Sequence, residues 1–190
     1  MLSRTASVGI AVLLMSSVID AGQLGRLFGR DQKFKPYKSA ALTMEYPDNW
    51  IQHPSLGNVV VMFSTSRADT SIAVERVRLS QPLVAAEMSD LSANLEAEDI
   101  KEQYPDATEI KSVLAAHPTL GRVIRSEYKR PGSAGPARPD RVRQFSIPSG
   151  SFLYKIIFRA READFAKQAP LFDHVISTVK IIDAPAKEGL

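Results

Sequence analysis

The sequence predicts an α+β fold, in which a mostly antiparallel sheet of about six or seven strands carries two main helices on its faces. Three observations lead to this prediction. Seven short runs have the apolar pattern of strands, and most of them are joined by links of hairpin length. Two longer segments have the composition or spacing of helices. The order is strands, helix, strands, helix, which lacks the alternation that is typical of a parallel sheet.

Three of the expected strands precede the first helix. Residues 40–46 (AALTMEY) alternate between two faces, and the turn Pro47-Asp48-Asn49 ends them. Residues 58–66 form an apolar run that suits a central strand, and residues 70–80 follow after a hairpin turn. Trp50, the only tryptophan, lies just beyond the first turn. We expect its indole to fill a junction between sheet and helix, with its N–H bonded to a carbonyl.

The first helix is expected at residues 87–103, which are rich in alanine, glutamate and leucine and contain neither proline nor glycine. Four strands should follow, at residues 109–116, 122–129, 141–147 and 152–159. Residues 129–140 hold three prolines and two glycines, which predicts a mobile hairpin loop.

The chain closes with a second predicted helix. Its apolar side chains recur at helical spacing, at Phe165, Ala169, Phe172, Ile176 and Val179. We expect Pro170 to divide this helix, because an internal proline removes a hydrogen bond and clashes with the preceding turn.

The N-terminus has the pattern of an export signal. One arginine precedes an apolar run, and small residues follow at Ala21-Gly22. The run is shorter than a transmembrane helix requires, so no stable span is expected after cleavage. We assign residues 1–21 to a signal peptide, 22–36 to a linker, 37–183 to one domain and 184–190 to a tail. With no cysteine, the chain has no disulfides and no thiolate metal sites.

Five segments, taken in order along the chain, carry a resemblance to a known family. They are YPDNW (residues 46–50), EQYPDA (102–107), HPTLGRV (117–123), LYKIIFRA (153–160) and FAKQAPLFDHVISTVKI (165–181). Together they resemble the PsbP-like group, which shares an α/β/α sandwich with the yeast Ran-binding Mog protein. The match covers residues 37–182. In this motif set, Tyr46, Pro47, Trp50 and Phe172 are interpreted as structural residues.

The resemblance implies a PsbP/Mog-like sandwich and a non-enzymatic accessory or assembly protein that binds a larger protein complex. Such proteins are exported to the periplasm, the cell surface or, in photosynthetic organisms, the thylakoid lumen. The sequence lacks the Arg- and Ser-rich transit peptide of a plant lumenal protein. Binding to photosystem II is therefore not carried over to this chain.

A basic set on one predicted hairpin is the most suggestive polar feature. It consists of Lys129, Arg130, Arg138, Arg141 and Arg143. Arginine suits bidentate contacts with carboxylates or phosphates, so the hypothesis is docking to an acidic partner or an anionic envelope surface. The alternative interpretation is a charged hairpin that protects a sheet edge from unwanted pairing. The net charge of +3 is small for a nucleic-acid binder, and no nucleic-acid partner is expected.

The sequence contains no recognisable catalytic or cofactor motif. His53, His117 and His174 are isolated and lack the spacing of a zinc site, so we expect neither a metal nor a cofactor. The acidic residues Glu96, Glu98, Asp99 and Glu102 are interpreted as a solvated helix surface. Ser149-Gly150-Ser151 does not fit a nucleophile elbow and is read as a turn.

The sequence therefore predicts an exported, non-catalytic, monomeric accessory or binding protein of the cell envelope, periplasmic or extracellular. Two alternatives stay open. A small hydrolase with an active site at a sheet edge would need histidine, serine and carboxylate groups that converge in space. A carrier of a small ligand or ion would need an apolar pocket with a few polar groups.

Overall fold

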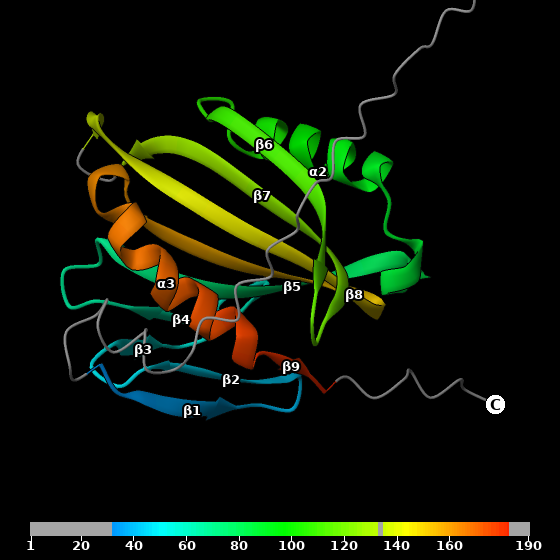
Figure 1. Ribbon diagram of the computed structural model, residues 1–190, viewed down its shortest axis with the longest axis horizontal. Coiled ribbons are helices and arrows are strands. Elements are labelled where there is room, and N and C mark those ends of the chain that lie inside the picture. Colours follow the sequence, from blue (N-terminus) through cyan, green and yellow to red (C-terminus); the bar gives the residue numbers. More distant parts are fainter. Residues whose placement is uncertain (1–31, 133–134, 183–190) are drawn as a thin grey trace, which may run out of the picture.

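The structure is a computed structural model that describes residues 32–132 and 135–182 (Figure 1). The expected signal peptide and the expected tail at residues 184–190 lie outside the described residues. The first strand, β1 (Phe34–Lys38), pairs with β2 (Leu42–Pro47) from Phe34 onward. Residues 34–36, which the sequence placed in the linker, thus belong to the folded body.

The strands form two antiparallel sheets, and helices pack on them. The other strands are β3 (Ile51–His53), β4 (Val59–Ser64), β5 (Thr70–Leu83), β6 (Thr108–His117), β7 (Gly121–Gly132), β8 (Gly135–Arg161) and β9 (Lys180–Ile181). The helices are the short 3₁₀ turn η1 (Ala85–Glu87), α2 (Asp90–Gln103) and α3 (Glu162–Thr178).

The larger sheet has the order β3-β4-β5-β8-β7-β6, and every neighbouring pair in it is antiparallel. This confirms the expectation of a mostly antiparallel sheet of about six or seven strands with two main helices. The smaller sheet, with the order β1-β2-β9, was not expected. The strand predicted at residues 40–46 belongs to this second sheet, where it pairs with the first and last described strands.

Strand β8 folds back on itself. Its first part pairs with β7 as far as Ser146, and its second part pairs with β5 from Gly150 onward. Arg159 Nε lies 3.8 Å from Asp140 Oδ2, whereas a fully extended segment from residue 140 to residue 159 would span about 65 Å. Gly150 has a φ of 57°, a left-handed conformation that favours glycine at the bend. The predicted strands 141–147 and 152–159 are thus both present within one element, and they run side by side in Figure 1.

The segment at residues 129–140 is mostly strand, although the sequence predicts a mobile loop. Strand β7 continues to Gly132, and the pairing with β8 reaches Gly132 opposite Gly135. Only the two residues at 133–134 separate the strands, and they fall between the described ranges. The prediction gave too much weight to proline and glycine content, because pairing with a neighbouring strand overrides local preference.

The two helices cover opposite faces of the larger sheet. Gln144 of β8 is hydrogen-bonded to Glu96 of α2. The next residue, Phe145, packs edge-on against Phe158, which stacks on Phe172 of α3 with centroids 4.7 Å apart. Because successive side chains of a strand point to opposite faces, α2 and α3 lie on opposite sides of the sheet. The architecture is therefore the expected α/β/α sandwich, with the smaller sheet added below α3 (Figure 1).

Helix α3 is continuous, with Pro170 inside it. The expectation that Pro170 divides this helix is wrong. Five of its side chains are buried: Phe165, Leu171, Phe172, Val175 and Ile176. Packing of this apolar face compensates for the hydrogen bond that proline removes. Helix α2 begins at Asp90, later than predicted, because the Ser89 side chain accepts a hydrogen bond from the Ser92 backbone and caps the helix there.

The largest core cluster joins both sheets to α3. It includes Leu42 and Met44 of the smaller sheet together with Phe63, Phe158 and Phe172, all nearly or fully buried. The two sheets therefore do not have separate cores. We expect them to unfold together, because neither can bury its apolar face alone.

The residues interpreted as a structural motif lie in or beside this cluster. Tyr46 is buried and stacks on Phe63 with centroids 3.8 Å apart, and Pro47 ends β2. Trp50 is 6% exposed and lies on the connection from β2 to β3, where the chain passes from the smaller sheet to the larger one. The Trp50 backbone N–H donates to the Pro47 carbonyl at 3.1 Å, and a bond from the indole N–H stays a prediction.

Candidate functional site

Two cations of the basic hairpin share the same two carboxylates. Lys129 Nζ lies 2.7 Å from Glu109 and 3.3 Å from Glu162. Arg141 approaches the same partners at 3.5 Å and 3.4 Å. The hydrogen bond with Glu109 raises the pKa of Lys129, and it lowers the pKa of Glu109 in turn. These four side chains join β6, β7, β8 and α3 in one surface network.

The other three cations of the set have different surroundings. Arg143 pairs with Glu127 and with Asp173, each at 2.9 Å. The guanidinium carbon of Arg130 lies 3.7 Å from the centre of the Tyr104 ring, which is a close cation–π contact. Arg138 is exposed and has no ion pair within the part of the chain that the structure describes. Much of the expected positive surface is therefore neutralised inside the protein.

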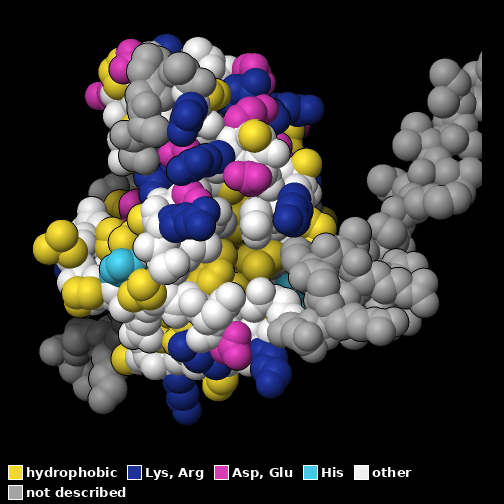
Figure 2. Space-filling model, turned by 90° about the vertical axis from the view of Figure 1, so that its left-hand side faces the viewer, with side chains coloured by type: hydrophobic (Ala, Val, Ile, Leu, Met, Phe, Trp, Pro, Cys, Tyr) yellow, Lys and Arg dark blue, Asp and Glu magenta, His cyan; other side chains and the backbone are white. Residues whose placement is uncertain are grey.

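The surface at this end of the molecule is mixed in charge. Figure 2 views the molecule from the left of Figure 1 and shows basic and acidic side chains interspersed over its upper part. Such alternation is typical of a solvated face held by ion pairs, each of which contributes little by itself. The exposed cation at Arg138 is the part of the set that a partner can reach directly.

The three histidines make separate contacts. His174 Nε2 lies 3.0 Å from Glu45, His53 Nε2 lies 2.8 Å from Ser64 Oγ, and the Thr119 backbone N–H donates to His117 Nδ1. Burial lowers the pKa of His117. Among residues 32–132 and 135–182, no three metal-ligating side chains come together in a way that could hold an ion. In the same ranges, no helix is long and apolar enough to cross a membrane.

The pair of His53 and Ser64 is the nearest approach to a hydrolase site. Ser64 is 3% exposed, and its hydroxyl donates to the Thr65 carbonyl at 3.1 Å. Within the described ranges, neither His53 nor Ser64 contacts a carboxylate side chain. A nucleophile needs access to substrate and a base that is oriented by a third group. This pair offers neither, and the hydrolase alternative gains no support from it.

The interpretation of Glu96 as a solvated residue is wrong. Its side chain is buried beneath α2, where Lys155 Nζ lies 3.0 Å away and Gln144 donates a hydrogen bond to it. Ala93 and Ile100 are buried on the same helix face. The position of Glu96 on that stripe, between Ala93 and Ile100, was the available signal, because residues three and four apart share a face. Glu98, Asp99 and Glu102 are exposed as expected.

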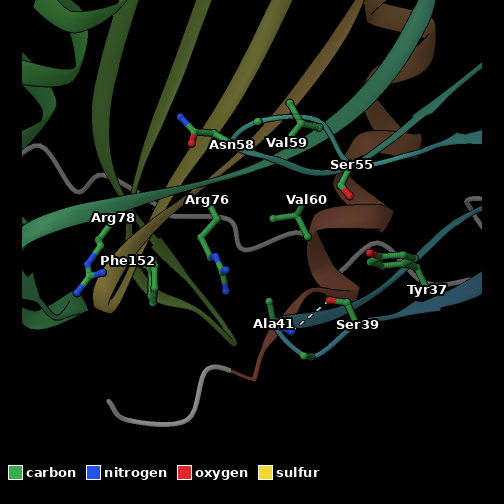
Figure 3. Close-up of a pocket in the computed structure, with 12 residues that line it drawn as sticks. Tyr37, Ser39, Ala41, Ser55, Asn58, Val59, Val60, Arg76, Arg78 and Phe152 are labelled. Atoms are coloured by element: carbon green, nitrogen blue, oxygen red, sulfur yellow. Dashed lines mark hydrogen bonds between the residues drawn. The ribbon is translucent and has the colours of Figure 1, made fainter. Parts of the chain in front are cut away.

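A cleft of about 500 Å³ lies between the smaller sheet and one end of β5, and sequence reasoning missed it (Figure 3). Tyr37, Ser39 and Val60 line one part of it, and Arg76, Arg78 and Phe152 line another. The guanidinium carbon of Arg76 lies 4.6 Å from the centre of the Phe152 ring. These residues come from separate segments that only the folded chain brings together, so no motif in the sequence could have revealed the cleft.

The hydroxyl of Ser39 shapes the turn at the edge of this cleft. It accepts hydrogen bonds from the backbone N–H groups of Ala41 and Leu42, each at 3.2 Å, and one of these is drawn in Figure 3. It also lies 3.3 Å from the Leu42 carbonyl. Because its hydrogen-bonding capacity is used within the turn, the Ser39 hydroxyl has little left to offer a ligand.

Comparison with known proteins identifies the fold through solved structures. No protein-family model matches the sequence. No curated protein matches it either. Cyanobacterial PsbP (CyanoP) from Synechocystis is 17% identical with a TM-score of 0.55, and the match covers 80% of this chain and 94% of that chain. The Ran-binding protein Mog1p of Saccharomyces cerevisiae is 14% identical with a TM-score of 0.53, over 80% and 97% of the two chains.

A third solved structure is LpqN, which is involved in cell envelope biogenesis of Mycobacterium tuberculosis. It is 11% identical with a TM-score of 0.52, over 78% of this chain and 90% of that chain. The three likenesses confirm the expected PsbP/Mog-type fold. At these identities they establish the fold and not the partner, because one fold serves many functions.

Proposed function

We propose that this chain is an exported, non-catalytic, PsbP-like binding protein of the cell envelope that docks on a larger protein complex. The observation that carries the proposal is the PsbP/Mog-type fold, found in a Ran-binding protein and in a protein of envelope biogenesis. The export pattern in residues 1–21 supports a place in the periplasm or at the cell surface.

The docking surface in this proposal is the end of the β7–β8 hairpin. Arg138 faces solvent there and is free to make a bidentate contact with a partner carboxylate. Arg130 lies over the Tyr104 ring, while Lys129, Arg141 and Arg143 hold the hairpin against α3 and β6 through their ion pairs. The paired cations thus fix the shape of the surface, and Arg138 is the side chain that contacts the partner.

The test is affinity purification of the exported protein from an envelope extract at low salt, followed by mass spectrometry. Arg138→Glu is compared with Arg67→Glu, which makes the same charge change at an exposed arginine of the β4–β5 turn. We expect Arg138→Glu to lose the captured complex and Arg67→Glu to retain it. Arg141 and Arg143 are left unchanged because reversing them would break the ion-pair network.

A sedimentation assay with phosphatidylglycerol vesicles distinguishes a protein partner from an anionic surface. Electrostatic attachment to anionic lipid grows with the number of nearby cations and weakens with salt. We expect the wild-type protein to stay in the supernatant. If the protein binds vesicles but captures no protein, its docking target is an anionic lipid surface and not a protein complex. If Arg138→Glu and Arg67→Glu capture the same proteins, the hairpin is not the docking site.

A further inference from the structure

We propose that residues 24–30, which lie just before the first described residue, bind an open face of strands β3, β4 and β5 in the same molecule. This contact is separate from the docking surface proposed above, which lies at the end of the β7–β8 hairpin. The proposal depends on the open face itself, on an unpaired carboxylate within it, and on the composition and reach of the segment.

Helix α2 covers only part of its side of the larger sheet. It packs on β6 and β7, at one edge of the sheet, and reaches β8 through the ion pair of Glu96 with Lys155. Strands β3, β4 and β5 lie toward the other edge, away from α2 (Figure 1). Helix α3 packs on the opposite side of the sheet. The α2 side of β3, β4 and β5 is therefore the open face.

The open face carries apolar side chains. Phe158 of β8 faces α3, so its neighbour Ile157 points to the other side. Register pairing places Ala73 of β5 and Met62 of β4 in line with Ile157. Ile51 joins them from β3, because its pairing partner on β4 is two residues from Met62. The first three are only partly buried and Ile51 is 49% exposed, so the apolar patch extends to the edge of the sheet.

A partly buried carboxylate on the same face lacks a counter-ion. Glu75 is two residues from Ala73 on β5 and therefore points to the open side. Its register partner Lys155 forms its ion pair with Glu96, at 3.0 Å. Within residues 32–132 and 135–182, Glu75 has no ion pair of its own. Because a partly buried charge is costly unless it is paired, Glu75 favours a cation in whatever covers this face.

The segment that precedes β1 has a matching composition. Residues 24–30 (LGRLFGR) combine three large apolar side chains with two arginines and contain no acidic residue. These five residues are Leu24, Leu27, Phe28, Arg26 and Arg30. A linker that only connects two parts is typically rich in small or polar residues and needs no such side chains. On the open face, the apolar groups would gain the free energy of burial and an arginine could pair with Glu75.

The segment is also long enough to reach the open face. The Asp48 backbone N–H donates to the Lys33 carbonyl at 3.0 Å, so the chain enters β1 beside the turn that leads into β3. Ile51 follows Asp48 by three residues. An extended chain spans about 3.3 to 3.6 Å per residue, so Leu27 can lie about 17 Å from the first described residue. Strand β5 is two strand spacings, or about 10 Å, from β3, which lies within that reach.

The experiment traps the contact as a disulfide, which the absence of native cysteine allows. The exported protein carries Gly29→Cys with Ala73→Cys, and the control carries Gly29→Cys with Ala166→Cys, the same change at an exposed alanine of α3. Each protein is reduced and then oxidised with copper phenanthroline. A disulfide requires Cα atoms within about 7 Å of each other. We expect the 29–73 disulfide to form within monomers, about tenfold faster than the 29–166 disulfide.

Further changes, made in the protein with Gly29→Cys and Ala73→Cys, connect the trapping to the named side chains. Leu27→Ser with Phe28→Ser should slow the 29–73 disulfide by about tenfold, because the apolar contact is lost. Gln23→Ser, just outside the segment, is the control and should leave the rate unchanged. Glu75→Gln should slow it by about threefold, because it removes only the charge. Far-ultraviolet circular dichroism reports whether each variant has folded.

Several results would overturn this inference. One is an equal rate for the 29–73 and 29–166 disulfides, and another is an unchanged rate after Leu27→Ser with Phe28→Ser. A 29–73 disulfide found only in dimers would assign the contact to a second copy of the chain. An exported protein whose mass lacks residues 24–30 would also reject the contact. Because none of these measurements uses the hairpin or its partner, failure here leaves the proposed docking function intact.

Discussion

Phe172 is the side chain on which the packing of α3 most depends. It is fully buried, stacks on Phe158 and lies 5.9 Å from Phe165 between ring centroids. We expect Phe172→Ala to lower the free energy of unfolding by about 3 to 5 kcal/mol, measured by urea denaturation. Leu91→Ala, at a leucine that is 67% exposed, serves as the control and should stay within about 0.5 kcal/mol. A loss below about 1 kcal/mol for Phe172→Ala would contradict this packing.

His117 should titrate below its ordinary value. Its burial lowers the pKa, so the folded protein resists protonation more than the unfolded chain does. As the pH falls through about 6.5, the unfolded chain takes up a proton that the folded chain refuses, and stability from this group is lost. A histidine NMR titration should place the His117 midpoint below about 6.5. A midpoint at or above that value would show that the ring is solvated.

Single side chains also show what the sequence could and could not predict at this scale. The burial of Tyr46, Trp50 and Phe172 agrees with their interpretation as structural residues, because large aromatic groups in a short chain have few other places to go. Glu96 was misread because composition marks a glutamate as a surface residue. Its burial is tolerable because the fold brings it two partners, the Lys155 ammonium and the Gln144 side-chain amide.

Helix α2 is attached to the sheet by a small set of buried residues, and one of them is charged. It buries Ala93, Glu96 and Ile100, while Leu91 and Leu95 remain exposed. The pair of Glu96 and Lys155 therefore lies at the centre of the contact between the helix and the sheet. The net contribution of this pair to stability is small, because the cost of desolvating the two charges offsets much of the attraction between them.

We expect Glu96→Ala to destabilise the protein by up to about 3 kcal/mol, because it leaves Lys155, whose side chain is only 14% exposed, without its carboxylate partner. The double change Glu96→Leu with Lys155→Met should be neutral or stabilising, because it removes both charges and keeps similar volume. Glu98→Ala, at an exposed glutamate of the same helix, is the matched control. Urea denaturation of the set measures the coupling, and equal effects of Glu96→Ala and Glu98→Ala would contradict the burial of the pair.

The elements predicted from the sequence were those with a strong local pattern. Strands β4 to β8 of the larger sheet and the apolar face of α3 follow from their apolar patterns or their helical spacing, whereas the short edge strand β3 was not predicted. The predictions of a break at Pro170 and of a loop at residues 129–140 were wrong because they relied on local residue preferences. At both places packing or strand pairing with other parts of the chain determines the structure. Strand β1 was missed for a related reason, since its identity as a strand depends on its pairing with β2.

At the scale of the whole molecule, the shared core predicts a single unfolding transition. Trp50 is the only tryptophan, and it lies where the smaller sheet meets the larger one. Its fluorescence therefore reports on the junction, while far-ultraviolet circular dichroism reports on the helices and sheets together. We expect the two urea transitions to coincide. Fluorescence that changes at lower urea would show that the smaller sheet separates first.

The cleft illustrates the limit of sequence reasoning for the whole molecule. Its arginines are on β5, its aromatic side chains are on β1 and β8, and its turn precedes β2. No spacing in the chain connects these segments, because their proximity exists only after both sheets have packed on one core. The basic hairpin was visible in the sequence, but its ion pairs with Glu109, Glu162 and Asp173 were not, since they cross between elements.

The pairing of β2 with β9 has a consequence for how the protein is made. A ribosome releases β2 well before its partner β9, which follows α3 in the chain. Leu42 and Met44 therefore remain without part of their cover until α3 and β9 have emerged. Chaperones that hold nascent chains would find an apolar binding site there until β9 pairs with β2.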